Sequence, residues 1–67
     1  MALDKNYYKS EIEMYKQDKE IYRYALITAV KEFDEDMIDT LCSRIHNCNT
    51  QIQYCLKRIN ELDAEDK

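Results

Sequence analysis

The chain has 67 residues, of which 45% are hydrophobic and 36% are charged, and its net charge is −4. A chain of this length forms at most one small domain, which we take to span 1–67, and so small a core is marginal unless a partner adds to it. Gly and Pro are both absent, which argues against phosphate-binding loops and tight β-turns and leaves helices uninterrupted.

The first predicted element is a helix over about 4–32. Its apolar residues are separated by alternating steps of three and four, which is the spacing of one buried helix face. Only Lys19 interrupts the pattern. The stripe consists of Tyr8, Ile12, Tyr15, Tyr22, Leu26, Ala29 and Phe33.

A turn over 33–35 and a second helix over about 36–62 follow. Asp34 or Asp36 can cap the second helix through a side-chain oxygen. A connection this short makes the helices antiparallel neighbours. The fold class is therefore all-α, a two-helix antiparallel hairpin resembling a coiled coil. Residues 63–67 lack periodicity, and we expect them to form a frayed tail.

The second helix carries an unbroken heptad stripe, which is the seam of a coiled coil. Four isoleucines recur every seven residues, and a second series follows each of them by three positions. Two members of that series are cysteines, small enough to accept bulky tyrosine rings from the facing helix. The predicted packing seam is Ile38, Leu41, Ile45, Cys48, Ile52, Cys55, Ile59 and Leu62.

Residues 21–30 are apolar almost all the way around the first helix, and a helix apolar on all sides is buried on all sides. One neighbouring helix cannot cover this segment, so we expect two hairpins to form a four-helix bundle. A weaker second stripe runs through Tyr7, Met14 and Ile21. The candidate partner interface is Tyr7, Met14, Ile21, Ile27 and Tyr54.

The net negative charge comes from the turn. Residues 1–33 hold six acids and six bases, residues 40–67 hold four of each, and the excess is Asp34, Glu35, Asp36 and Asp39. These acids suit the positive end of the second helix dipole. They also form a candidate acidic contact for a basic partner.

No pattern indicates catalysis, a cofactor or a metal. Cys42 and His46 share one helix face, but they supply only two of the four ligands that structural zinc needs. The lysines alternate with acids, which argues against direct binding of nucleic acid. We find no membrane span, signal core or lipidation motif, and three cysteines on one helix are typical of reduced thiols. We therefore expect a cytoplasmic protein.

These patterns predict a non-enzymatic protein–protein interaction module that acts by helix-on-helix packing. It would form a homodimer, or a bundle with a partner protein that it scaffolds or regulates. The alternative is a small acidic protein inhibitor, of the kind that phages or mobile elements encode, which occludes a groove on a larger enzyme. Under either prediction the chain has no small-molecule substrate.

Overall fold

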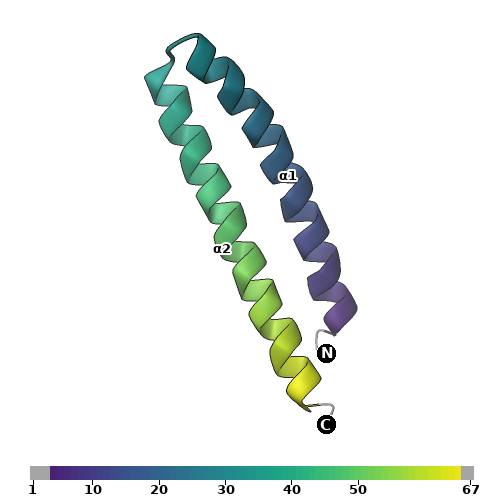
Figure 1. Ribbon diagram of the computed structural model, residues 1–67. Helices are drawn as coiled ribbons and strands as arrows, with labels where there is room; N and C mark the ends of the chain where they lie inside the picture. The colour runs from purple at the N-terminus through teal and green to yellow at the C-terminus, as the bar shows by residue number, and fades with distance from the viewer. Residues whose placement is uncertain (1–3, 66–67) are drawn as a thin grey trace.

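A computed structural model describes residues 4–65, and all of its regular structure is helical. Helix α1 spans Lys5–Lys31 and helix α2 spans Glu35–Glu65. The helices run antiparallel, side by side, with the connection at one end and the free ends of both helices at the other (Figure 1). No strand occurs in the described range. The prediction of an all-helical hairpin is confirmed.

Helix α1 is closed at both ends by hydrogen bonds. The side chain of Asp4 accepts from the backbone N–H of Tyr7 at 3.0 Å, which caps the N-terminus. At the C-terminus, the N–H of Asp34 donates to the carbonyl of Ala29 at 3.0 Å, and the N–H of Phe33 donates to that of Val30 at 3.1 Å. These two bonds define a Schellman motif, which reverses the chain in residues 32–34.

Phe33 occupies the left-handed position of that motif, with φ of 56°. The prediction that it ends the buried stripe of α1 is wrong, because its side chain is 86% exposed. Its spacing from Ala29 fits the stripe, but the helix has already ended at that point. A positive φ turns the side chain out of the helical path, and the stripe closes at Ala29.

Asp34 caps the second helix, accepting from the N–H of Met37 at 3.2 Å. Helix α2 extends to Glu65, three residues beyond the expected end, so 63–65 are helical and do not form a frayed tail. The ammonium of Lys5 lies 2.6 Å from the carboxylate of Asp63, which ties this last turn to the start of α1. Residues 66–67, the rest of the expected tail, lie outside the described range.

The core is one layer of side chains between the helices. Every member of the predicted packing seam is at least partly buried. Leu41, Cys48 and Cys55 are buried, whereas the four isoleucines and Leu62 are partly buried. The buried residues of α1 are Tyr8, Ile12 and Ala29.

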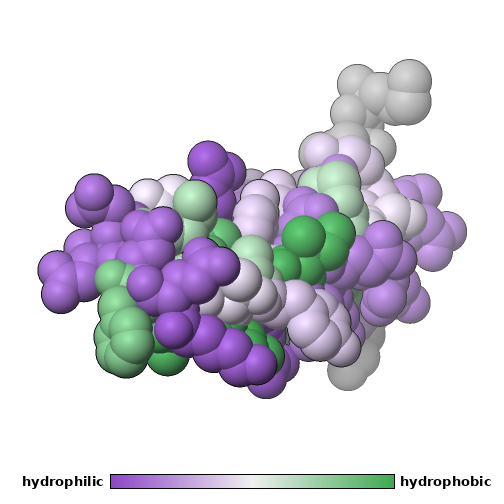
Figure 2. Space-filling model, turned by 90° about the horizontal axis from the view of Figure 1, so that it is seen from above, coloured by the Kyte–Doolittle hydropathy of each residue, from purple (hydrophilic) through white to green (hydrophobic). Residues whose placement is uncertain are grey.

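Much apolar surface stays outside this layer. Ile21 is 64% exposed and Tyr24 is 71% exposed. An end-on view of the hairpin shows apolar side chains at the surface between hydrophilic ones (Figure 2). The large hydrophobic side chains left exposed are Tyr7, Met14, Ile21, Tyr24, Ile27, Val30, Phe33, Met37, Tyr54 and Leu56.

Candidate protein–protein interface

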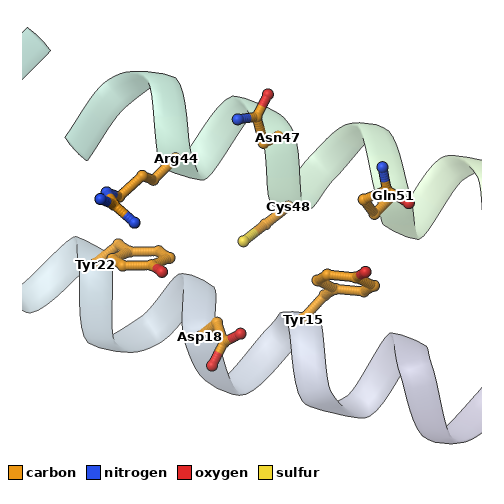
Figure 3. Close-up of a pocket in the computed structure, with 7 residues that line it drawn as sticks. All are labelled: Tyr15, Asp18, Tyr22, Arg44, Asn47, Cys48 and Gln51. Atoms are coloured by element: carbon orange, nitrogen blue, oxygen red, sulfur yellow. The ribbon is translucent and has the colours of Figure 1, made fainter. Parts of the chain in front are cut away.

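Two shallow grooves lie along one side of the hairpin, which we call the groove face. The central groove is formed where side chains of α1 and α2 meet over Cys48 (Figure 3). The thiol of Cys48 points between the rings of Tyr15 and Tyr22. The residues that line this groove are Tyr15, Asp18, Tyr22, Arg44, Asn47, Cys48 and Gln51.

The cysteines of the seam lie against tyrosines of α1. Cys55 belongs to the same core cluster as Tyr8 and Ile12, and Cys48 lines the groove with Tyr15 and Tyr22. Adding volume beside these rings would overpack the layer between the helices, which commonly costs stability. The small thiols therefore supply the room that the rings need.

Arg44 and Asp18 supply opposite charges to the central groove. The guanidinium of Arg44 lies 5.8 Å from the centroid of the Tyr22 ring, a cation–π contact. Within residues 4–65, neither Arg44 nor Asp18 forms an ion pair within 4.0 Å. Both charges are therefore available to a second molecule.

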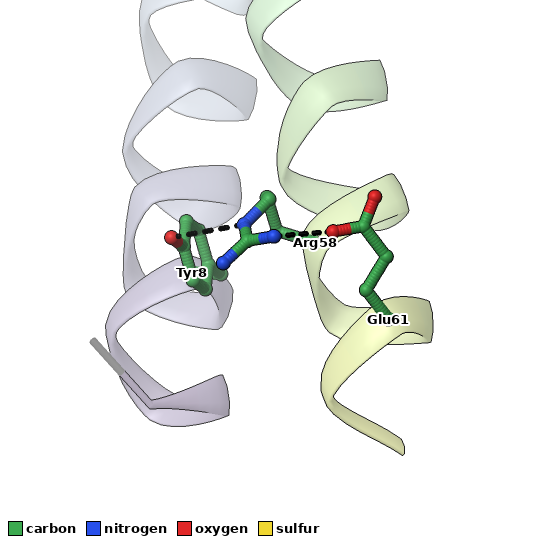
Figure 4. Close-up of polar contacts among 3 residues, drawn as sticks. All are labelled: Tyr8, Arg58 and Glu61. Carbon is green, nitrogen blue, oxygen red and sulfur yellow. Dashed lines mark hydrogen bonds and ion pairs between the residues drawn. The ribbon is translucent and has the colours of Figure 1, made fainter. Parts of the chain in front are cut away.

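A polar cluster lies nearer the free ends of the helices. The Nε of Arg58 donates to the hydroxyl of Tyr8 at 3.4 Å, and its guanidinium also pairs with Glu61 (Figure 4). These two hydrogen bonds raise the pKa of Arg58, with Tyr8 as the larger cause. The Tyr8 ring also meets Tyr7 edge-on at 5.2 Å and Tyr54 at 6.5 Å between ring centroids.

The second groove lies beside the turn. It is lined by Ala25, Thr28, Ala29, Glu32, Asp34 and Met37. Ala25 is seven residues after Asp18, and Met37 is seven before Arg44, so these residues repeat the positions that line the central groove. The two grooves therefore follow one another along the same face.

The structure brings four of the five candidate interface residues to the groove face. Tyr7, Met14 and Ile21 repeat at heptad spacing beside the grooves on α1, and Tyr54 lies one heptad beyond Asn47 on α2. Ile27 lies apart from them. It is nine residues after Asp18, which is two and a half helical turns, and it projects on the opposite side of α1.

The sequence interpretation missed the arginine row that α2 contributes to this face. Arg44, Gln51 and Arg58 recur every seven residues beside the seam of α2, and the same spacing relates Asp4, Glu11 and Asp18 on α1. The helices are antiparallel neighbours, so the two rows line the same side of the hairpin. The heptad spacing of the arginines was the signal that could have revealed it.

The four acids of the predicted acidic contact are exposed. Asp34, Glu35, Asp36 and Asp39 all reach solvent. Asp34 serves as the cap of α2, and Glu35 and Asp36 lie in its first turn, where they favour the positive helix end. These placements agree with a capping role, and they leave the carboxylates accessible to a partner.

Two side chains between the helices have raised pKa values. Burial, together with the charge of Glu11, raises the pKa of Tyr15 and the pKa of the Cys55 thiol. The third thiol, Cys42, is exposed, as is His46. Within residues 4–65, no three His, Cys, Asp or Glu side chains converge in a way that could hold a metal ion.

Neither described helix combines the length and the apolar character needed to cross a bilayer. No protein-family model, curated protein or solved structure matches this chain. The groove face is an open surface of the hairpin that combines exposed apolar side chains with charged ones.

Proposed function

We propose that the chain is a non-enzymatic protein–protein interaction module that completes its core by packing its groove face on further helices. It does so as a homodimer, forming a four-helix bundle, or in a bundle with a partner protein that it scaffolds or regulates. The observation that carries this proposal is the exposure of the Tyr7, Met14, Ile21 and Tyr54 side chains in the lone hairpin.

The energetics support a covering partner. A two-helix layer buries few side chains, because only six apolar residues of the described range are buried. Each large apolar side chain that becomes fully covered contributes about 1.5–3 kcal/mol. A second hairpin would supply several such side chains at once, which is how small helical domains commonly reach stability.

The mass of the purified chain at micromolar concentration, measured by light scattering, tests the proposal. We expect a dimer or higher assembly. The matched variants are Ile21→Lys and Ile27→Lys, since both isoleucines are exposed on α1 but point about 120° apart around the helix, and only Ile21 lies beside the grooves. Ile21→Lys should dissociate the assembly and Ile27→Lys should not. A stable, fully helical monomer would overturn the proposal.

The second candidate function is the small acidic inhibitor that occludes a groove on a larger enzyme. Phe33 favours it, because an apolar ring at the extreme end of the hairpin, flanked by exposed acids, suits insertion into a basic-rimmed groove. Changing Asp34, Glu35, Asp36 and Asp39 together to Asn distinguishes the functions. A scaffold keeps its partner, whereas an acid-dependent inhibitor loses affinity, chiefly through a slower association rate with weaker salt dependence.

A further inference from the structure

The charges of the groove face differ between its two helices. On α1 the heptad row beside the seam contributes Glu11 and Asp18, and on α2 the corresponding row contributes Arg44 and Arg58. The acids of one hairpin therefore lie along one edge of the face, and the arginines lie along the other edge.

The heights of these charges along the hairpin also match. Arg44 stacks on Tyr22, one helical turn from Asp18, and Arg58 stacks on Tyr8, three residues from Glu11. One turn is about 5.4 Å along the axis, which the long arginine side chain spans. A second hairpin at the same height thus presents each arginine opposite an acid.

We infer that a second copy of this chain packs on the groove face in the parallel orientation, with both turns at the same end of a four-helix bundle. The two-fold axis then runs along the bundle and places α1 of each hairpin on α2 of the other. Asp18 meets Arg44 of the second copy and Glu11 meets Arg58 of the second copy. Two-fold symmetry makes each pair occur twice.

The antiparallel orientation gives the opposite result. It places α1 on α1 and α2 on α2, so the acid row of one hairpin lies on the acid row of the other, and no acid of α1 meets an arginine of α2. Like charges across an interface disfavour a pairing, and this is how charge selects orientation. The apolar residues fit the parallel orientation, because Tyr54 of the second copy then lies at the height between Tyr7 and Met14.

The acids at the turns oppose the parallel orientation only weakly. Asp34, Glu35, Asp36 and Asp39 are all exposed to solvent, and exposed charges are screened over about 8 Å at physiological ionic strength. Glu11, Asp18 and Arg58 are already partly buried in the lone hairpin, so their pairs act in a less polar medium once the face is covered.

The inference rests on the homodimer under "Proposed function", and its first test measures orientation in that dimer. A spin label is placed at the turn through Glu35→Cys in a Cys42→Ser chain, and the label-to-label distance is measured by pulsed electron paramagnetic resonance. The parallel dimer places the two labels within about 25 Å, the width of a bundle. Labels separated by most of the bundle length would overturn the inference.

Charge exchange supplies a second test. Asp18→Arg alone, or Arg44→Asp alone, should raise the dimer dissociation constant by at least about tenfold, because each change creates two repulsive pairs. An equimolar mixture of the two variants should form a heterodimer with wild-type affinity, because both pairs between the chains are then of opposite charge. Within each chain, positions 18 and 44 still carry like charges. Glu13→Arg, on the far side of α1, is the control and should leave the dissociation constant unchanged.

The outcomes separate the two proposals. A wild-type chain that stays monomeric removes the homodimer itself. A dimer whose labels are far apart, or whose affinity is indifferent to Asp18→Arg, leaves the homodimer intact and overturns only the parallel orientation.

Discussion

Phe33 adopts a backbone conformation that costs free energy locally. At φ of 56° its Cβ lies close to the backbone, and the left-handed conformation costs a non-glycine residue roughly 1–2 kcal/mol. Its ring recovers little by burial, since it is 86% exposed. A partner that covers the turn would explain why an exposed apolar ring is kept at a position with an unfavourable backbone conformation.

Phe33→Gly should therefore stabilise the isolated chain. We expect the free energy of unfolding to rise by about 0.5–1 kcal/mol, because glycine adopts positive φ freely but loses more entropy on folding. Urea unfolding followed by circular dichroism measures the change. Phe33→Ala is the control, since it removes the ring but keeps Cβ, and an equal gain in both variants would contradict the backbone explanation.

Ionisation of Tyr15 and Cys55 should make the free energy of unfolding vary with pH in the alkaline range. Their folded pKa values are raised by burial, so the fold favours the protonated forms. That contribution is complete below the unfolded pKa values, about 8.5 for the thiol and about 10 for the phenol, and it is lost as pH rises through the folded values. The chain should therefore lose stability progressively as the pH rises above about 8.5, where the unfolded thiol begins to ionise.

The comparison that isolates this effect is wild type against a Tyr15→Phe, Cys55→Ala double variant. Urea midpoints measured across the alkaline range should fall more steeply for wild type. Parallel curves would show that these two groups do not govern the pH dependence.

At the scale of the element, small thiols on α2 lie against large rings on α1. Cys55 is buried against Tyr8 and Ile12. A leucine, which a generic heptad would place there, would have to displace one of these side chains. The seam is therefore specific to its own partner helix and does not suit an arbitrary apolar one.

Cys55→Leu should destabilise the hairpin by about 1–3 kcal/mol through overpacking, although it increases the hydrophobicity of the seam. Cys55→Ala is the matched control, because it removes only the sulfur and should cost less. Thermal unfolding of both variants checks the order. A leucine variant more stable than wild type would show that the layer holds unfilled space.

At the scale of the whole molecule, the hairpin is a rod of 52 × 18 × 14 Å, and a rod of two helices has too little interior for its apolar residues. Stability and association should therefore be coupled. Raising the protein concentration tenfold should add up to about 1.4 kcal/mol to the apparent stability of a dimer.

Thermal melts over a hundredfold range of concentration measure this coupling directly. The midpoint should rise with concentration for wild type and for Ile27→Lys, and it should stay constant for Ile21→Lys. A wild-type midpoint that does not move would mean that the hairpin unfolds as a monomer.

The sequence by itself determined the two helices, their antiparallel arrangement and the stripe that packs between them. These follow from heptad spacing, the absence of Gly and Pro, and a short connection, all of which act locally. Only the tertiary structure decided that Phe33 leaves the stripe, which side of the hairpin carries the two grooves, and that acids and arginines share that side. These features depend on where α1 ends and on how the two helices align in space. Spacing along one helix does not say which residues of the other helix lie at the same position along the hairpin axis.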